Sequence, residues 1–409
     1  MLITVAEAKA RIDSGVVPLP PERVPLETAL AEGRTLRQDV EADADSPAFD
    51  RSAMDGYAVA EGEGVFRVVG SVRAGEVYSG EVPLRPGTCV RIFTGAAVPE
   101  GTIRVVMQEE SKAERETVVF SPGALEEGRP LYLRRRGEEY RRGGRLIGEG
   151  TRVGPVEASV LAMGGTALPW VGRRPRVTHV VTGGELVPPD GTPRPGQIRD
   201  SNSSLVAGLI ARAGAALVRQ VRVGDDGEAL RREVGQATAE GSDLLLISGG
   251  AGEGETDFGR RTLEEAGFGI AFAWVGMRPG KPTIFALKEG VPAFCLPGNP
   301  LSHYVAFQLF VRRALLALQG GRQEAAEREA EVEWDAPVSV RGSGGRETYH
   351  PCHWQIDAGR VDVRVLHWTS SGHLVSLLGA NGMLMPGAGS SMKSGARTEN
   401  NLARLVWWP

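Results

Sequence analysis

Along residues 174–318, segments whose hydrophobic pattern is typical of β-strands alternate with segments whose apolar residues recur at helical spacing. Short apolar runs, such as "RVTHVV" and the "DLLLIS" that ends at Ser248, predict strands. The nearly continuous apolar character of "DLLLIS" is typical of a strand that is covered on both faces. Between these runs, residues 201–215 carry apolar side chains at helical spacing and begin with Ser201 and Asn202, which predict a helix cap there.

The same alternation continues along the region and predicts a doubly wound α/β domain, with a largely parallel sheet covered by helices on both faces. The further strands expected in it are residues 216–223, 270–275, 283–287 and 291–296, and the further helices are residues 225–241, 257–266 and 299–318.

Two other regions have a different pattern. Residues 42–173 are rich in Gly, Pro, Val and Arg, and turn residues recur about every 8–12 positions, which predicts an all-β region. Residues 331–409 are again β-rich, with runs such as "APVSVRG", "GRVDVRVL" and "ARLVWWP". The patterns therefore predict a multidomain chain with a short N-terminal helix, a β region, an α/β domain and a β-rich C-terminal part.

Length and charge narrow the class of protein. The chain has 409 residues, which at roughly 150 residues per domain favours about two or three domains. Its formal net charge of −4 gives no reason to expect a nucleic-acid partner. No apolar run approaches the ~20 residues that span a bilayer, and residues 1–15 carry charged side chains instead of an apolar signal core. We therefore expect a cytoplasmic protein that does not bind a membrane.

The three cysteines, Cys89, Cys295 and Cys352, lie far apart and form no Cys-x-x-Cys pair. This spacing disfavours a disulfide framework and a structural zinc site. His350 and His353 flank Cys352, but their spacing matches no common zinc pattern. A strand of mixed exposure is the preferred interpretation of that stretch.

Charged side chains cluster in the loops that follow the predicted strands. In an open α/β sheet these loops meet at the carboxyl edge, where ligands bind. Carboxylates beside glycine-rich loops fit Mg²⁺, which is usually bound through one or two acids together with substrate phosphates. Arg and Lys would hold a phosphate or another oxyanion. For any single acid, a solvated turn is the alternative. The loops at this edge carry Glu185, Asp225, Asp226, Asp257, Arg278 and Lys281.

Two familiar nucleotide-binding motifs are approached but not matched. The stretch "GGAGEG" is followed by Glu255, which occupies the position where G-x-G-x-x-G requires its last glycine. In "GMRPGKPT", Pro282 replaces the Ser or Thr of a P-loop. Neither stretch supports a dehydrogenase or a Walker-type ATPase. "LPGNPLS" instead predicts a rigid turn at Gly298 and Asn299 that starts a helix, where backbone amides could cradle an anion.

The β region adds polar candidates. Asp55 and Thr94 lie beside glycines in "DRSAMDGYAVA" and "RIFTGAAVPEG". Asp55 followed by Gly56 is also an ordinary turn signal, which is the structural alternative. The basic stretch 134–145 suits a phosphorylated ligand through its clustered arginines, or else forms a solvated surface.

These stretches together resemble one family over nearly the whole chain. "SAMDGYAVA", "RIFTGAAVPEG", "RRRGEE", "TGGELV", "GQIRDSNSSLVAGLI", "SGGAGEGETDF", "RPGKP", "LPGNPLS" and "SGHLVSLLGANG" occur in the order found in the molybdopterin molybdotransferases, which are the MoeA proteins and the C-terminal domain of gephyrin. The resemblance implies a transferase of molybdenum-cofactor biosynthesis. Such an enzyme inserts molybdenum from molybdate into adenylyl-molybdopterin and releases AMP, assisted by Mg²⁺ or another divalent cation.

The resemblance also implies roles for individual residues. The expected catalytic residues are Asp55, Thr94, Glu185, Asp225, Asp257 and Lys281, and the expected metal ligands are Glu185, Asp225 and Asp257. The expected substrate-binding residues are Arg135, Arg136, Ser248, Gly249, Gly250, Arg278, Pro297, Gly298, Asn299 and Ser371.

Four positions depart from the family pattern. Arg278 stands where the family has Lys, Gly184 stands where it has an acid, Gly252 replaces a serine, and Glu253 adds a negative charge. Arg keeps the charge of Lys but presents a planar group of different geometry.

The family's architecture implies an elongated homodimer whose active-site cleft uses both chains, with other molybdenum-cofactor biosynthesis proteins as partners. Its domains correspond to an α/β molybdopterin-binding domain of residues 1–22 and 174–322, a linking β domain of residues 23–41 and 143–173, an inserted β domain of residues 42–142, and a β-barrel-like C-terminal domain of residues 323–409.

Two alternatives stand beside this reading. One is a non-catalytic scaffold or molybdopterin-binding protein of the same family, and the other is a nucleotide-binding hydrolase that does not handle molybdenum. Glu185, Asp257 and Lys281 together disfavour a pure scaffold, which would need none of them.

Overall fold

The computed structural model describes residues 2–252, 258–322, 325–333, 346–357, 360–386 and 402–408. The chain divides into two compact units. Unit 1 consists of residues 1–38, 149–158 and 168–409, and unit 2 consists of residues 39–148 and 159–167.

The centre of unit 1 is a six-stranded sheet with the strand order β16-β13-β17-β21-β20-β18. Its strands are β13 (Arg176–Thr182), β16 (Ala216–Val223), β17 (Leu244–Ser248), β18 (Gly269–Phe272), β20 (Ile284–Lys288) and β21 (Val291–Leu296). β13 pairs in parallel with β16 and β17, and β17 pairs in parallel with β21, whereas β20 is antiparallel to both of its neighbours. Every residue of β17 is buried, as predicted for a strand covered on both faces.

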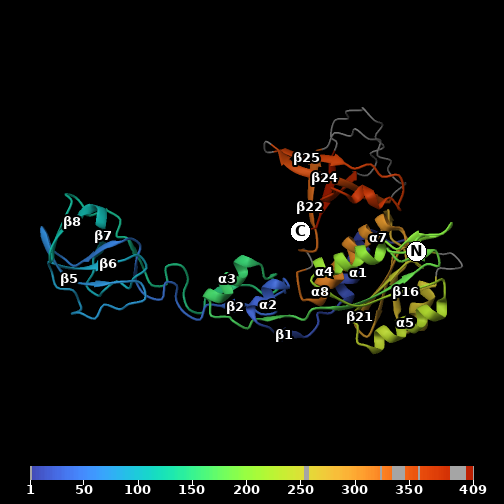
Figure 1. The fold of residues 1–409 in the computed structure, drawn as a ribbon, viewed down its shortest axis with the longest axis horizontal. Coiled ribbons are helices and arrows are strands. Elements are labelled where there is room, and N and C mark those ends of the chain that lie inside the picture. The colour runs from blue at the N-terminus through green and yellow to red at the C-terminus, as the bar shows by residue number, and fades with distance from the viewer. Residues whose placement is uncertain are drawn as a thin grey trace. The chain divides into compact units, whose positions relative to one another are not determined.

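Helices cover both faces of this sheet (Figure 1). Leu244 and Leu246 of β17 pack on one face with residues of α1 (Val5–Gly15), α4 (Asn202–Arg212), α7 (Pro300–Ala306) and α8 (Arg312–Leu318). Leu245 and Ile247 point the opposite way and pack with α5 (Gly227–Ala239) and α6 (Gly259–Glu265). The alternation of side chains along one apolar strand thus builds two cores, and the predicted doubly wound α/β domain is confirmed.

The last helix of this domain is continuous. α7, a π-helical segment (Phe307–Val311) and α8 follow one another without a break from Pro300 to Leu318, which confirms the helix predicted from "NPLSHYVAFQLFVRRALLAL". At about 1.5 Å per residue, it is roughly 28 Å long. Its two ends therefore lie at opposite sides of the domain.

Side-chain caps explain where several helices begin. Thr4 and Glu7 form a reciprocal capping box at the start of α1. The N-cap residue of α4 is Ser201, as predicted, but its side chain makes no capping hydrogen bond. The preceding residue supplies the side-chain hydrogen bond instead, since Asp200 Oδ1 accepts from the backbone N–H of Ser203 at 3.0 Å.

Two short strand pairs and two helices are formed by residues near the boundaries between the two units. β1 (Pro21–Arg23) pairs with β12 (Trp170–Gly172), and β2 (Val40–Glu41) pairs with β11 (Arg145–Ile147). The helices are α2 (Leu26–Ala31) and α3 (Pro155–Met163). The prediction that residues 42–173 are all-β is therefore wrong at α3. Its sequence, "PVEASVLAM", begins with proline and is rich in helix formers, so the signal was present.

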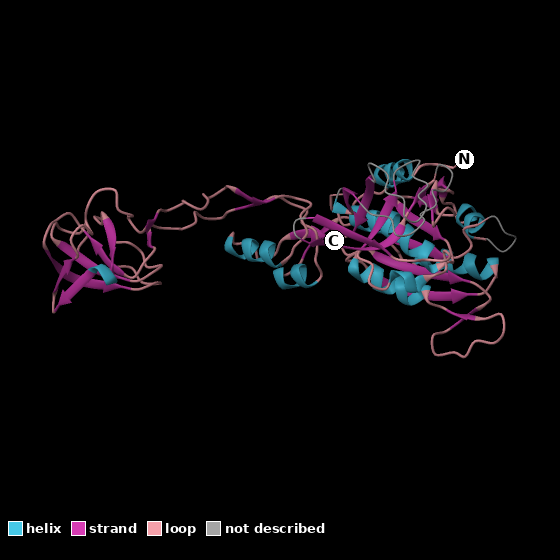
Figure 2. Cartoon of the chain, turned by 90° about the horizontal axis from the view of Figure 1, so that it is seen from above, coloured by secondary structure: helices cyan, strands magenta, loops and turns pink. Residues whose placement is uncertain are grey.

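Unit 2 is built mainly of strands, which Figure 2 shows in magenta. Its six-stranded sheet has the order β7-β4-β6-β5-β9-β8. The strands are β4 (Gly56–Val59), β5 (Val65–Val72), β6 (Thr88–Ile92), β7 (Arg104–Met107), β8 (Ser111–Glu114) and β9 (Thr117–Phe120), and a short pair consists of β3 (Arg51–Ser52) and β10 (Leu133–Arg134). A Cβ at Gly56 would lie 1.9 Å from the carbonyl oxygen of Val106 on β7. The close approach of β4 to β7 therefore requires a glycine at position 56. The interpretation of Asp55 and Gly56 as a turn signal did not predict this contact.

The C-terminal part of unit 1 holds a five-stranded antiparallel sheet in the order β22-β27-β26-β24-β25. Its strands are β22 (Arg328–Glu333), β24 (His350–Asp357), β25 (Arg360–Val365), β26 (Gly382–Pro386) and β27 (Leu402–Trp407). The strands predicted in "GRVDVRVL" and "ARLVWWP" are confirmed, whereas "APVSVRG" lies outside the described residues. β19 (Met277–Arg278) pairs with β23 (Glu347–Thr348) and connects this part to the α/β domain.

Candidate active site

The loops that carry most of the predicted site residues meet at one edge of the α/β sheet. Glu185 and Asp225 follow the neighbouring strands β13 and β16, and Gly249 follows β17. Because β20 is antiparallel to both β18 and β21, β18 points the same way as β21. The loop of residues 273–283, which follows β18, therefore reaches the same edge as the loop after β21.

The strand order separates opposite charges along this edge. Glu185 and Asp225 lie at β13 and β16, while Arg278 and Lys281 lie beyond β21, and the glycine loop after β17 is between them. Neighbouring strands are about 4.8 Å apart, so the acidic and basic halves are roughly 10 Å or more apart. Asp257, the third predicted metal ligand, lies outside the described residues.

In the acidic half, Asp225 bonds to the loop that carries Glu185. Asp225 Oδ2 accepts from the backbone N–H of Gly184 at 3.1 Å. A Cβ at Gly184 would lie 2.9 Å from the same oxygen, and one at Gly183 would lie 2.7 Å from Glu185 Oε2. The carboxylates of Asp225 and Glu185 thus lie directly over the backbone of Gly184 and Gly183, where no side chain intervenes. The glycine found where the family has an acid has a physical reason, because a larger residue would displace Asp225.

Asp226, the neighbouring acid, has a different task. Its Oδ1 accepts from the backbone N–H groups of Glu228 and Ala229 at 2.9 and 3.1 Å, which caps α5. These hydrogen bonds lower the pKa of Asp226. A hollow of about 290 Å³ opens beside it, lined by Asp225, Asp226, Gly227, Glu228, Arg231, Phe258, Arg261 and Thr262.

The glycine loop after β17 requires glycine at two positions. Gly249 has φ +90° and Gly250 has φ +66°, and a Cβ at Gly249 would lie 2.5 Å from Thr182 Oγ1. The loop also approaches the next loop of the edge, because the amide of Gly249 donates to the Leu296 carbonyl at 2.9 Å. Ser248, predicted to bind substrate, is only 1% exposed and lies behind this loop.

Ser248 instead joins two buried histidines. Its Oγ lies 2.6 Å from Nε2 of His179 and 3.5 Å from Nε2 of His303. Burial holds the pKa of His179 well below its usual range and lowers that of His303 to about 4, so both rings are neutral.

Only one direction of donation satisfies this network. The amide of Gln220 donates to His179 Nδ1 at 2.9 Å, so His179 donates from Nε2 to Ser248. Ser248 then donates to His303, whose Nδ1 donates to the Pro297 carbonyl at 3.2 Å. The chain of bonds therefore links β16 to the "LPGNP" turn, and Ser248 positions the loops without facing a substrate.

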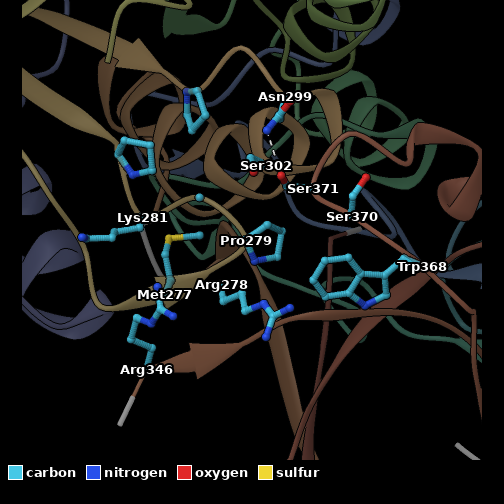
Figure 3. A pocket seen from close by; sticks show the side chains of 13 residues that line it. Met277, Arg278, Pro279, Lys281, Asn299, Ser302, Arg346, Trp368, Ser370 and Ser371 are labelled. Atoms are coloured by element: carbon cyan, nitrogen blue, oxygen red, sulfur yellow. Dashed lines mark hydrogen bonds between the residues drawn. The ribbon is translucent and has the colours of Figure 1, made fainter. Parts of the chain in front are cut away.

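The basic half contains a pocket of about 410 Å³ between the α/β domain and the C-terminal part of unit 1. Figure 3 shows Arg278 and Lys281 on the loop after β18, with Trp368, Ser370 and Ser371 on the C-terminal side. Among the described residues, the lining contains no carboxylate. It consists of Met277, Arg278, Pro279, Gly280, Lys281, Pro282, Pro297, Asn299, Ser302, Arg346, Trp368, Ser370 and Ser371.

Two aromatic rings orient the cations of this pocket. The guanidinium carbon of Arg278 lies 5.4 Å from the Trp368 ring centre, and Nζ of Lys281 lies 5.7 Å from that of Trp274. Trp368 donates from its indole N–H to Nδ1 of His350 at 3.1 Å. Burial, followed by the charge of Arg278, lowers the pKa of His350 to about 4, so this imidazole stays neutral and can accept.

Ser371 ties the C-terminal part to the start of α7. Asn299 Nδ2 donates to Ser371 Oγ at 2.8 Å (Figure 3). The Ser371 carbonyl accepts from the backbone N–H groups of Leu301 and Ser302 at 3.0 and 3.4 Å. The expectation that amides at this helix start cradle an anion is therefore wrong for the first turn, because the Ser371 carbonyl already occupies them.

Sequence reasoning missed several residues around these loops. Asn202, expected to be a helix cap, is buried and donates to the Gly298 carbonyl at 2.7 Å. Trp368 and Arg346 also line the basic pocket. Arg346 follows the glycines of "RGSGGRE", so a local signal was present for it, whereas Trp368 lies in no charged or glycine-rich motif. Only "SGHLV", which contains Ser371, indicated that the C-terminal region contributes to the pocket.

In unit 2, the structure brings Asp55 and Thr94 together. Asp55 Oδ1 accepts from both the backbone N–H and the hydroxyl of Thr94, each at 2.7 Å, and these bonds lower the pKa of Asp55. The arginine run is held by acids. Asp50 accepts from the Arg135 guanidinium and the Arg136 amide at 2.6 and 2.8 Å. Both guanidinium groups stay largely exposed, so they remain accessible to a ligand.

Neither a metal cluster nor a membrane helix stands out in the described part of the chain. No three His, Cys, Asp or Glu side chains in those ranges are grouped so as to hold a metal ion. Within the same ranges, no helix combines the length and apolar character needed to cross a membrane. Cys89, Cys295 and Cys352 are buried, and none of them forms a disulfide within those ranges.

Comparison with known proteins defines the class. Residues 3–165 match the MoeA N-terminal region (domain I and II), and residues 178–317 match a probable molybdopterin binding domain. A molybdopterin biosynthesis MoeA protein from Pyrococcus horikoshii has a crystal structure that aligns over 100% of both chains, with a TM-score of 0.78 and 25% identity. The fold is thus that of a multidomain MoeA protein.

Curated relatives give the family. Molybdopterin molybdenumtransferase from Nostoc sp. is 33% identical over 90% of this chain and 85% of the relative. The protein of the same name from Haemophilus influenzae is 30% identical over 92% of each chain. This chain therefore belongs to the molybdopterin molybdenumtransferase family.

Proposed function

We propose that this protein is a molybdopterin molybdotransferase, which inserts molybdenum from molybdate into adenylyl-molybdopterin and releases AMP. The observation that carries the proposal is the separation of charge along one sheet edge, with carboxylates at β13 and β16 and cations at the loop after β18. A substrate that joins a phosphoanhydride to a metal-binding dithiolene needs both environments a short distance apart. Family membership gives the same reaction class.

The basic pocket suits molybdate. Arg278 and Lys281 contribute positive charge, and Ser302 and Ser370 contribute hydroxyls. The part of the lining that the structure describes holds no carboxylate that would repel an oxyanion. In the described part of the chain, neither cation forms a salt bridge. Their stacking on Trp368 and Trp274 holds them in place without neutralising them.

The acidic half suits a divalent cation. Glu185 and Asp225 are hard oxygen donors that lie over a glycine backbone, and neither is bound to an Arg or Lys among the described residues. Mg²⁺ is commonly held by one or two carboxylates together with substrate phosphates, so this pair fits it. A cation bound there would neutralise charge on the phosphoanhydride. Asp257 would be a third ligand by the resemblance.

The chain's own groups then have separate tasks. Lys281 and Arg278 would hold molybdate while the two dithiolene thiols replace one of its oxygens, which leaves as water with both thiol protons. Attack of a water molecule on the phosphoanhydride gives AMP and the phosphate monoester of the pterin. The loop at Gly249 and Gly250 carries no side chains there, so the substrate could lie across it and reach both the acidic and the basic half of the sheet edge.

We further infer that the working unit is a homodimer in the cytoplasm. Asp55 and Thr94 lie in unit 2, whereas Glu185 and Lys281 lie in unit 1, and the family's chemistry uses both sets. A site shared between two chains would supply all four.

The test is AMP release from adenylyl-molybdopterin. The protein is incubated with this substrate, Mg²⁺ and molybdate, and parallel samples omit either the cation or the molybdate. We expect AMP release that requires both. Release at the same rate without molybdate would identify a hydrolase instead, and no release would favour a non-catalytic member of the family.

A further inference from the structure

The chain segment that carries His350 is bonded to the backbone of Arg278. β19 and β23 form a parallel pair, in which the amide of Glu347 donates to the Gly276 carbonyl at 2.9 Å. The amide of Tyr349 donates to the Arg278 carbonyl at 2.8 Å. β24 begins at the next residue, His350, which is buried. The imidazole of His350 is therefore anchored one residue away from the hydrogen bond that holds the Arg278 backbone.

The imidazole of His350 also fixes the ring of Trp368. The indole N–H donates to His350 Nδ1 at 3.1 Å, and the two ring centres are 5.8 Å apart. Because an indole nitrogen can only donate, His350 must present a lone pair at Nδ1 and carry its proton on Nε2. Burial, followed by the charge of Arg278, lowers the pKa of His350 to about 4, so the ring keeps this neutral form near neutral pH. The main chain supports the contact, since the amide of Leu366 donates to the Pro351 carbonyl at 2.7 Å.

These contacts form a closed circuit around one cation of the basic pocket. The Arg278 guanidinium lies beside the Trp368 ring, with 5.4 Å between its central carbon and the ring centre (Figure 3). A cation is attracted to the face of an aromatic ring, so the plane of the indole determines where the guanidinium lies. Without an acceptor for its N–H, the indole could turn to another side-chain rotamer. His350 thus restrains Arg278 twice, through the backbone of the preceding residue and through the ring.

We propose that His350 is a positioning residue for oxyanion binding, because it fixes the Trp368 ring and thereby directs the N–H fork of Arg278 toward the anion. This inference rests on the proposed function, since it deepens the account of the molybdate pocket. Arg278 and Trp368 are among the described residues that line the pocket, and His350 acts through them without touching the anion. A side chain that is held in place before binding loses less conformational freedom when the anion binds, which raises the affinity.

The test measures molybdate affinity of the full chain by calorimetry. His350→Leu removes the acceptor, and we expect its affinity to be about three- to fivefold lower than that of wild type. His350→Asn should restore most of the affinity, because its amide oxygen takes the place of Nδ1. His353→Leu is the matched control, since it makes the same substitution on the same strand, at a ring that donates to the Gly379 carbonyl at 3.0 Å.

Two further measurements separate positioning from a loss of structure. In an Arg278→Ala background, His350→Leu should weaken molybdate binding no further, whereas a general structural loss would weaken it in both backgrounds. In protein with isotope-labelled tryptophan, the indole N–H resonance of Trp368 is identified by its absence from Trp368→Phe. That resonance should shift in His350→Leu and stay near its wild-type position in His353→Leu.

The outcomes distinguish this inference from the proposed function. Wild type that binds no molybdate would refute the proposed function and this inference together. If wild type binds molybdate, unchanged affinity in His350→Leu or no recovery in His350→Asn would overturn the inference alone. An equally large effect of His350→Leu in the Arg278→Ala background, or an unshifted Trp368 resonance, would overturn it as well.

Discussion

His179 Nε2 lies 2.6 Å from Ser248 Oγ, inside the sheet and directly behind the glycine loop of the candidate active site. The family resemblance implied that this serine binds substrate. Its burial assigns it instead to a chain of hydrogen bonds that ends at the Pro297 carbonyl. That chain requires neutral imidazoles, because a protonated ring could no longer accept from Gln220 or Ser248.

The first prediction is that stability falls in mild acid because of these histidines. The pKa of His303 is about 4 in the folded protein, against about 6.5 in the unfolded chain. The unfolded chain therefore binds more protons between these values, and the free energy of unfolding decreases as the pH falls through that window. His303 alone would cost about 3 kcal/mol at pH 4.

Chemical unfolding between about pH 7.5 and pH 5 tests this prediction. His303→Gln should lower the free energy of unfolding at neutral pH. It should also reduce the number of protons taken up on unfolding by up to one, so that stability depends less steeply on pH. His367→Gln is the control, because His367 is exposed. An unchanged pH slope in His303→Gln would show that the ring does not stay neutral through burial.

The second prediction concerns the departure at Arg278. Lys would keep the charge but lose the planar contact with Trp368, so we expect Arg278→Lys to weaken molybdate binding roughly three- to tenfold. Trp368→Leu should act in the same direction. The double variant should be little worse than either single variant, since both remove one interaction. Fully additive losses, measured by calorimetry, would mean that the ring does not orient the guanidinium.

The third prediction tests the strand contact at Gly56. Gly56→Ala should destabilise unit 2 by roughly 2–4 kcal/mol, because the new methyl group would lie 1.9 Å from the Val106 carbonyl oxygen. Gly235→Ala on α5 is the matched control, since a Cβ there meets nothing within 4 Å. That change should stabilise by about 0.5–1 kcal/mol. Equal and small effects in chemical unfolding would refute the close approach.

A fourth prediction follows from the proposed shared site. Asp55→Ala and Glu185→Ala homodimers should each lack AMP release. After subunit exchange, one of the two sites in a mixed dimer would receive both wild-type residues, so partial activity should return. Sedimentation first establishes the dimer. A mixed dimer without recovered activity, or a fully active monomer, would contradict the shared site.

The sequence predicted the α/β domain well because each of its elements carries a local signal. β17 is a continuous apolar run, and α5 begins at an aspartate that caps it. The missed features depend on contacts between distant residues. Asn202 bonds to Gly298, Trp368 stacks on Arg278, and Gly56 faces Val106, and none of these pairings leaves a periodic or compositional trace.

In the candidate site too, features with a local sequence signal were predicted, and features that depend on distant contacts were missed. Among the described residues, the predicted acids Glu185, Asp225 and Asp226 and the cations lie at the expected sheet edge, because parallel strand direction alone determines where those loops meet. Their separation into two halves needed the strand order, which the sequence does not specify. Likewise, the Ser371 carbonyl occupies the first amides of α7 only because the C-terminal part folds against that helix.

The central claim is that the acidic half of the sheet edge supports AMP release and the basic half binds molybdate. One comparison tests this claim most directly. Molybdate affinity and AMP release are measured together for Glu185→Gln and Lys281→Ala, with Lys288→Ala as a control whose amine bonds to the Ala266 carbonyl. We expect Glu185→Gln to lose Mg²⁺-dependent AMP release but bind molybdate as wild type does. Lys281→Ala should bind molybdate about tenfold more weakly at low salt, with a smaller loss at high salt. Glu185→Gln that releases AMP at the wild-type rate, or Lys281→Ala that binds molybdate normally, would contradict the account.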